Sequence, residues 1–377
     1  MTTSTSPPTT PPVGTAPRLP RHRLALLLLG GIGLVLGVYT GLGRAGIEHR
    51  FVAPDLHGVI MVLGFLGTVI ALERAVALGT RWGYLGPALT GAATLTLPLV
   101  RPVGGLLLVL GGLVVTATYL ELLRRGGREV HLAIMGLGAL AWVGAAVLWL
   151  AGLGPIRITP LLAAFLVLTI VGERLELSRL TLPSARSRRR FLVAVGVFAL
   201  GVAMAAFWRS TGLLLGGLGL LGQVAWLSRY DLARRTVRRT GLTRFIAICL
   251  LTAYVWMAVS GVLWIAMALG ASGHLMHDAL VHSLFVGFVL SMVMGHAPII
   301  VPAVLRTPLE FQPIAYLPLV LLHGSVAVRI GADLLGSEAW REVALHGNVL
   351  ALTVFLILTV RSVRRGRRAA TTVAVPA

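Results

Sequence analysis

The segment from His274 to Pro302 reads HLMHDALVHSLFVGFVLSMVMGHAPIIVP. It is apolar enough to cross a lipid bilayer, yet it contains four histidines and one aspartate. A four-residue spacing puts His274, Asp278 and His282 on one side of a helix, and a spacing of two heptads puts His282 and His296 on one stripe. Lipid does not tolerate such groups, so we expect the stripe to face neighbouring helices and water, or a cofactor.

The composition of the chain is that of a membrane protein. Of its 377 residues, 56% are hydrophobic and 12% are charged, whereas soluble chains are about 25% charged. About twelve apolar runs follow one another, which predicts an all-α integral membrane protein with about twelve transmembrane helices. The single cysteine, Cys249, excludes an internal disulfide and a thiolate metal cluster.

The runs divide the chain into one domain and two tails. We expect a disordered cytoplasmic tail at residues 1–20, a single twelve-helix domain at 21–363 and a cytoplasmic tail at 364–377. No clear cleavage site follows the first apolar run, so we expect a retained helix there and not a signal peptide. The predicted spans are residues 24–42, 55–79, 83–100, 103–123, 130–152, 155–177, 191–208, 212–228, 245–270, 276–302, 312–334 and 341–362.

Arginine placement predicts the topology. All 33 basic residues are arginine; 24 fall in segments on the side of the N-terminus, six on the other side and three within spans. The positive-inside rule then predicts a multi-pass protein of a bacterial-type cytoplasmic membrane with both termini in the cytoplasm. The net charge of +20 therefore indicates contact with anionic membrane lipids and not nucleic-acid binding.

This topology gathers six of the ten histidines at the outer face; they are His49, His57, His274, His277, His282 and His346. Imidazole binds transition metals and haem iron. His57 of span 2 and His282 of span 10 have similar predicted depths, as two haem ligands require. A copper site needs about three nitrogens, which His282, His346 and either His277 or His274 would supply. The spacing alone does not decide between haem and copper.

The inner ends of two spans carry adjacent charges, Glu73-Arg74 in span 2 and Glu173-Arg174 in span 6. Spans 2, 6 and 10 are four helices apart, which suggests three diverged blocks of four. The simplest interpretation is that the arginines extend to the membrane surface and pair with the glutamates. A functional interpretation is a proton or anion route, or neutralisation of haem propionates. Arg329 and Asp333, four residues apart, are expected to form a local helix pair.

Two motifs carry a family resemblance. Residues 57–68, HGVIMVLGFLGT, and the series His282, Gly287, Met292 followed by Gly295-His296 resemble the NnrS family. Members are twelve-helix bacterial membrane proteins that contain haem and copper and are associated with tolerance of nitric oxide. That family resembles the catalytic subunit of haem-copper oxidases, in which three four-helix arcs enclose the cofactors and helices 2 and 10 each supply a histidine to the low-spin haem.

The resemblance implies haem b bound by His57 and His282, copper as a second cofactor, and a role in nitric-oxide or metal handling with a diatomic gas or a redox partner. His296 matches the family's Gly-His and is a third candidate cofactor residue. The chain departs from the oxidases in one respect. Oxidase helices 6 and 7 supply copper histidines, and spans 6 and 7 contain none. We therefore do not expect a centre that reduces oxygen or nitric oxide.

Two other functions fit the residues. In a two-haem electron conduit, His282 and His296 would serve stacked haems, with His131 or His323 as further ligands. In a secondary transporter, the Glu-Arg pairs would act in gating or coupling. That function predicts inverted repeats and helices broken near the midplane, and the sequence has no convincing inverted repeat.

Overall fold

The protein is a bundle of long helices. The computed structural model describes residues 20–44, 53–126 and 129–373, and these residues form helices and connecting turns without a strand. Ten of the described helices are long and apolar enough to cross a membrane. The all-α, multi-pass membrane architecture expected from the sequence is therefore confirmed, although ten helices and not twelve meet the requirements for a span.

The helices follow one another with short connections. Span 2 is one continuous rod, Pro54–Leu78, and span 10 is another, residues 274–305. In chain order the elements are α1 (Arg21–Arg44), η1 (Pro54–Leu56), α2 (His57–Val59), η2 (Ile60–Leu66), α3 (Gly67–Leu78), η3 (Trp82–Tyr84), α4 (Leu85–Thr96), α5 (Arg101–Gly126), α6 (Val130–Leu150), α7 (Pro155–Leu177), η4 (Ser178–Thr181), α8 (Ala185–Met204), α9 (Arg209–Tyr230), α10 (Ala233–Thr236), α11 (Gly241–Ala268), α12 (His274–His282), η5 (Ser283–Leu290), α13 (Ser291–Leu305), η6 (Pro313–Ala315), α14 (Tyr316–Leu335) and α15 (Glu338–Val373).

Two expected spans, α4 and α8, fall short for different reasons. Helix α4 has 12 residues, which is about 18 Å of helix and less than the thickness of the hydrocarbon core, about 30 Å. Helix α8 has 20 residues but begins ARSRRR, so its apolar part is shorter than the helix. At the C-terminus the structure differs in the other direction, because α15 continues to Val373, beyond the expected end of the domain.

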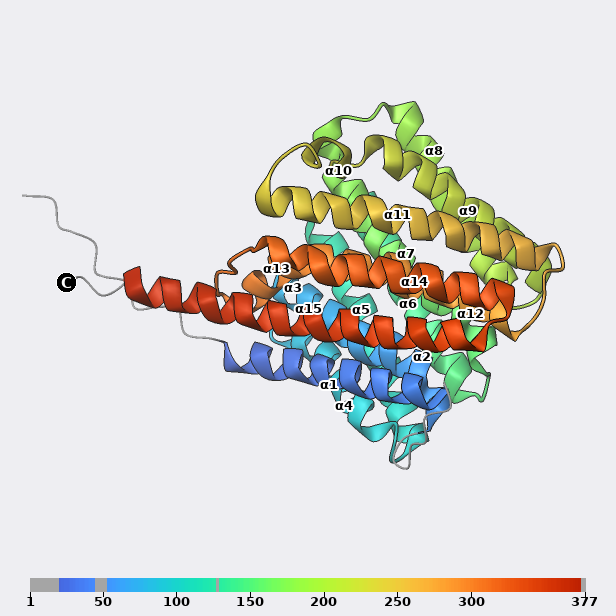
Figure 1. Cartoon of the computed structure of the whole chain (residues 1–377), viewed down its shortest axis with the longest axis horizontal. Coiled ribbons are helices and arrows are strands. Elements are labelled where there is room, and N and C mark those ends of the chain that lie inside the picture. The colour runs from blue at the N-terminus through green and yellow to red at the C-terminus, as the bar shows by residue number, and fades with distance from the viewer. Residues whose placement is uncertain (1–19, 45–52, 127–128, 374–377) are drawn as a thin grey trace, which may run out of the picture.

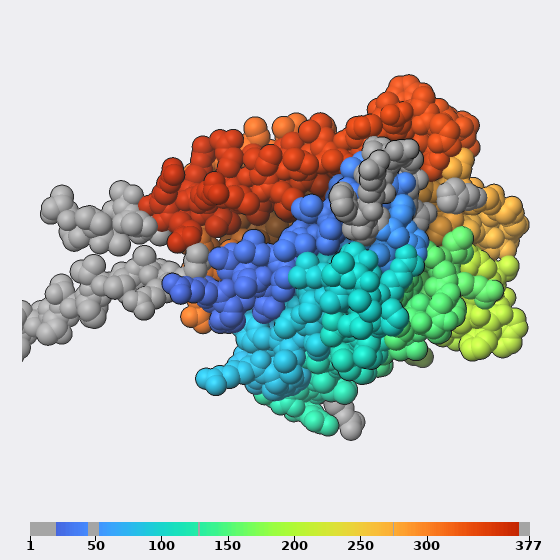
Figure 2. Space-filling model, turned by 90° about the horizontal axis from the view of Figure 1, so that it is seen from below, coloured from blue at the N-terminus to red at the C-terminus, as the bar shows by residue number. Residues whose placement is uncertain are grey.

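The core is built around α7 and span 2. In their most apolar stretches, 72% of the residues of the rod containing α7 and 61% of those of span 2 are buried, against 28% for α1 and 17% for α15. Figure 2 shows α1 and α15 on one face of the molecule, where their apolar side chains are exposed. Exposed apolar helices of this length are what a lipid environment requires.

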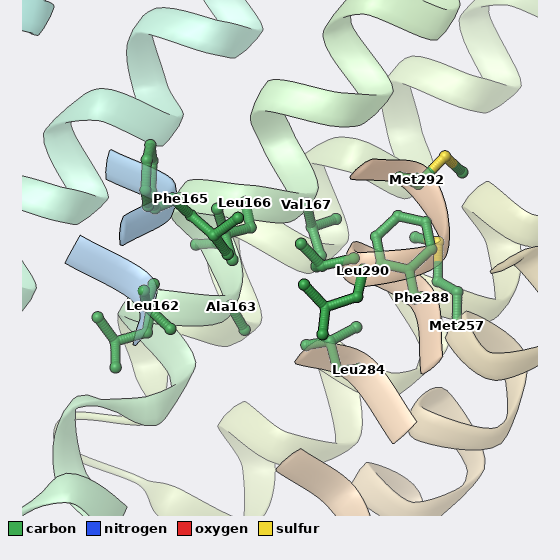
Figure 3. Close-up of a cluster of buried hydrophobic side chains, with 14 of the residues drawn as sticks. Leu162, Ala163, Phe165, Leu166, Val167, Met257, Leu284, Phe288, Leu290 and Met292 are labelled. Atoms are coloured by element: carbon green, nitrogen blue, oxygen red, sulfur yellow. The ribbon is translucent and has the colours of Figure 1, made fainter. Parts of the chain in front are cut away.

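Apolar side chains fill the space between α7 and span 10. Figure 3 shows Val167 of α7 beside Leu290 of η5, with Leu284 and Phe288 near them and Met257 of α11 beyond; Leu162 and Phe165 lie on the other side of α7. All of these residues are buried. Helix α7 therefore contributes apolar packing to the core.

Helix α1 approaches span 2 closely because it presents glycine. A Cβ on Gly33 would lie 3.1 Å from the backbone nitrogen of Phe65, and one on Gly41 would lie 2.9 Å from Cε1 of His57. The two helices therefore touch from the His57 level to the Phe65 level. This contact positions the His57 ring against the α1 backbone.

Candidate functional sites at the two ends of spans 2 and 10

Spans 2 and 10 run in the same direction through the bundle. In Figure 1, α2 and α12 lie toward one end, and α3 and α13 lie toward the other, where α15 extends beyond the bundle. We call the end with α2 and α12 the His57 end. The end with α3 and α13 is the His296 end.

At the His57 end, the His57 ring is held by α1. Its Nδ1 lies 2.7 Å from the carbonyl oxygen of Gly37. A carbonyl only accepts hydrogen bonds, so Nδ1 donates and the lone pair of the neutral ring is on Nε2. Two residues earlier, Asp55 forms a bidentate ion pair with Arg101 of α5, with both oxygens 2.9 Å from guanidinium nitrogens. The start of span 2 is therefore fixed from both sides.

His282 has a matching arrangement within span 10. Its Nδ1 lies 2.9 Å from the carbonyl oxygen of Asp278 and 3.3 Å from Oδ2 of the same residue. Both are acceptors, so this ring too has its lone pair on Nε2 when it is neutral. Metal-binding histidines commonly donate their other N–H to a carbonyl or carboxylate, which fixes the tautomer and the ring orientation. His57 and His282 both have this arrangement, which His296 and His346 share.

The backbone after each of these histidines is also alike. In span 2 a π-helical segment, η2, begins three residues after His57, and in span 10 a π-helical segment, η5, begins directly after His282. π-helical turns are rare and occur frequently at functional sites. Each segment contains a glycine in close contact: Gly64 packs against Thr94, and Gly287 packs against Trp256.

The carboxylate of Asp278 belongs to an ion-pair network that joins spans 10, 11 and 12. Oδ2 of Asp278 accepts from Nε and Nη2 of Arg329 at 2.8 and 2.6 Å. Arg341 of α15 donates to Asp333 at 2.8 Å and lies 3.9 Å from Asp278. The expected local pair of Arg329 with Asp333 is present at 3.5 Å. The shorter contacts of Arg329 go to Asp278, however, so its main role is across helices.

The four histidines proposed for copper do not form a ligand group among the described side chains. Within the described ranges, no three His, Cys, Asp or Glu residues are arranged to hold a metal ion. His346 is exposed on α15, with Nδ1 2.8 Å from the carbonyl of Glu342. His277 lies one turn before His282 on α12. The side chain of His274, and all of His49, lie outside the described part.

At the His296 end, charged side chains from spans 2, 6 and 10 meet. Arg74 pairs with its neighbour Glu73 and, at 2.9 Å, with Glu173 of α7. Arg174 of α7, which is buried, lies 2.9 Å from Nε2 of His296. We call these five residues the Glu–Arg–His cluster. The two Glu-Arg pairs of the sequence are thus one structural unit.

His296 has both ring nitrogens engaged by protein groups. Nδ1 lies 2.6 Å from the carbonyl of Met292, so Nδ1 donates and Nε2 accepts from Arg174. The expected role of His296 as a cofactor residue therefore has no support in this arrangement. The remaining histidines of the two-haem interpretation are also engaged: His323 accepts from Trp256 at 2.7 Å, and His131 lies 3.4 Å from Glu176.

One buried polar pair was not anticipated from the sequence. Asp231, between α9 and α10, accepts from the hydroxyl of Tyr254 at 2.8 Å and from the backbone N–H of Ala233 at 2.7 Å. The signal in the sequence is a lone aspartate within the arginine-rich segment RYDLARR.

Comparison with known proteins adds one finding to this geometry. No curated protein matches the sequence. A family model described as a domain of unknown function, DUF8744, matches residues 23–364, which include all of α1 except its first two residues, every helix from α2 to α14 and most of α15. The chain therefore belongs to the DUF8744 family.

Proposed function

We propose that the protein is a b-type haem protein of a bacterial cytoplasmic membrane, with His57 and His282 as the two axial ligands. The observation that supports this pair is their shared setting: each ring donates Nδ1–H to a carbonyl, and each precedes a π-helical segment. The resemblance of the same two segments to the NnrS motifs supports it independently.

The residues present suit a haem iron. Two neutral imidazoles with Nε2 as the coordinating atom are a common axial pair for electron-transfer haems. The Asp278 carboxylate beside Nδ1 of His282 raises the basicity of that ring, and Arg329 holds the carboxylate in place. Haem supplies one-electron chemistry when it is bound, and the chain supplies the ligands, their tautomers and an apolar surrounding.

This ligand set favours electron exchange over gas reduction. If His57 and His282 both held the iron, the protein would supply both of its further ligands, and the side chains of α7 that Figure 3 shows near η5 are apolar. We therefore infer a redox partner that exchanges electrons at the His57 end, in a pathway that handles nitric oxide or metal ions. Copper bound by His282 and His346 with His277 or His274 is the alternative cofactor.

The proposal includes the topology. We infer that α4 and α8 also cross the membrane, which gives twelve spans with both termini in the cytoplasm. The arginines of the segments assigned to the cytoplasmic side support this. Arginines at the start of α8 reach the headgroup region with long side chains, so its apolar part need not span the full thickness.

An optical spectrum of the purified protein, oxidised and reduced, with metal analysis of the same sample, tests the proposal. We expect a Soret band and sharp reduced bands in wild-type protein, and loss of at least one ligand signature in His57→Ala and in His282→Ala. His346→Ala, an exposed histidine, is the matched control and should keep the wild-type spectrum. Full haem occupancy in both variants would refute the ligand pair. If the protein instead contains copper, and His346→Ala loses this copper as His282→Ala does, the result would favour the copper site that includes His282 and His346.

A further inference from the structure

Arginines line a cavity at the junction of α9, α10 and η4. The cavity has a volume of about 520 Å³, and its lining includes Arg229, Arg234, Arg235 and Arg238. It lies at the C-terminal end of α9 and includes neither His57 nor His282 in its lining. A role for this cavity is therefore independent of the proposed haem.

The wall of this cavity is fixed from behind by buried hydrogen bonds. Asp231 is 2% exposed. Its Oδ1 accepts from the backbone N–H of Ala233 at 2.7 Å, and its Oδ2 accepts from the hydroxyl of Tyr254 at 2.8 Å. On the other side, the hydroxyl of Thr181 donates to the carbonyl of Tyr230 at 2.7 Å. The turn that carries the arginines is therefore attached to α11 and η4.

The positive charge of the cavity is not neutralised by the described residues. Four arginines and one aspartate line it, and both oxygens of that aspartate are bonded to the protein behind the wall. Other arginines of the chain, such as Arg101, Arg179 and Arg341, have carboxylate partners. Within the described ranges, no carboxylate lies within ion-pair distance of the four arginines of the cavity.

We propose that this cavity binds a phosphate group, supplied by an anionic phospholipid or by a soluble phosphorylated molecule. The planar guanidinium group matches phosphate oxygens with two parallel hydrogen bonds, and several arginines around one concave site suit a multiply charged anion. Tyr230, on the cavity wall, packs against Trp226 with ring centroids 5.3 Å apart. Such aromatic pairs are typical of the membrane interface, where lipid phosphates lie.

The positive-inside rule explains why arginines occur on this side of the bundle, but it does not require them to enclose a cavity. The end of α15 provides the comparison. Arg361, Arg364 and Arg365 are exposed and spaced along a single helix. They have the same charge and side chain as the cavity residues, without the fixed turn. They therefore form a matched control for charge alone.

The first experiment is native mass spectrometry of the full-length protein, purified in mild detergent and titrated with cardiolipin, phosphatidylglycerol or phosphatidylcholine. The variant is R234Q/R235Q/R238Q, and the control is R361Q/R364Q/R365Q. If the phosphate is supplied by a lipid, the wild-type protein and the control variant bind cardiolipin and phosphatidylglycerol more tightly than phosphatidylcholine. Binding by the cavity variant should then be about 100-fold weaker, from the loss of three surface charges near the lipid.

The second arm distinguishes a soluble source. Pyrophosphate and inorganic phosphate are added to delipidated protein, and the thermal unfolding midpoint is measured. A rise with pyrophosphate in wild type and control, absent in the cavity variant, assigns the site to a soluble phosphorylated molecule. Equal behaviour of the cavity variant and the control in both arms would overturn the proposal. If the glutamine variant does not fold, R234K/R235K/R238K replaces it, and binding equal to that of the control would overturn the proposal in the same way.

Discussion

The two ends of spans 2 and 10 differ in how their polar groups are satisfied. At the His296 end, charged groups of three spans contact one another: Arg74 pairs with Glu173, and Arg174 contacts His296. At the His57 end, His57 and His282 each use Nδ1 on a nearby carbonyl, which orients Nε2 as the acceptor nitrogen. The first arrangement holds three helices together through contacts between their charged side chains. The second is the arrangement that the proposed haem ligands need.

The comparison teaches that a buried ionisable residue in a membrane span can serve either to hold helices together or to form a functional site. The Glu–Arg–His cluster supplies its own counter-charges, so it has a structural explanation without a transported ion. His57 and His282 share the Nδ1-to-carbonyl arrangement with His296, but each of them also precedes a π-helical segment, a backbone form that occurs frequently at functional sites. A functional site is therefore better supported at the His57 end.

Removing a charge from the Glu–Arg–His cluster should have the largest effect on stability. Arg74→Met leaves the carboxylates of Glu73 and Glu173 close together without their shared cation. Loss of one partner of a buried ion pair costs about 3–5 kcal/mol of unfolding free energy. Denaturant unfolding in detergent measures it, with exposed Arg81→Met as the control. Equal stability of the two variants would show that the cluster does not hold the spans together. The haem content of the folded fraction should not change.

Crowding the His57 ring should have an intermediate effect on stability and a specific effect on the cofactor. A Cβ on Gly41 would lie 3.0 Å from Nδ1 of His57, whereas one on Gly31 of the same helix would meet nothing within 4 Å. Gly41→Ala should cost about 1–3 kcal/mol, the usual penalty of overpacking. Gly31→Ala should stay within about 0.5 kcal/mol of wild type. A changed haem spectrum in Gly41→Ala alone is the expected result. An identical spectrum and stability in both variants would contradict the packing of His57 on α1.

The smallest effect should come from an exposed ion pair. Glu129, before α6, accepts from Arg179, and this hydrogen bond lowers the pKa of Glu129. A carboxyl whose pKa is lower in the folded state stabilises the fold at neutral pH, and this contribution is lost as the pH falls through the folded-state pKa. Acidification should therefore lower the unfolding midpoint slightly more in wild type than in Glu129→Gln. If Glu129→Gln lowered the free energy of unfolding more than Arg74→Met does, the contrast between exposed and buried ion pairs would be contradicted.

Most helix positions could be predicted from hydropathy, because lipid forces each backbone polar group into a helix and makes apolar length the main signal. The residues of α7, 155–177, were predicted without error. The errors have physical causes. Helix α4 ends earlier than expected because Pro98 interrupts the helix within the apolar run, and residues 97–99 form a turn. Helix α15 extends further because its arginines are good helix formers that continue the helix beyond the apolar run.

The sequence by itself determined the membrane class, the two histidine-bearing spans and the adjacent Glu-Arg pairs, since composition and local spacing carry all three. Only the tertiary structure decided which charges meet. Arg74 and Glu173 are 99 positions apart, and Arg174 and His296 are 122 apart. Local periodicity reports which face of a helix a residue occupies, but not which helix that face meets. For the same reason, the sequence left Asp278 without its main partner, Arg329, and the arginines beside Asp231 without their cavity.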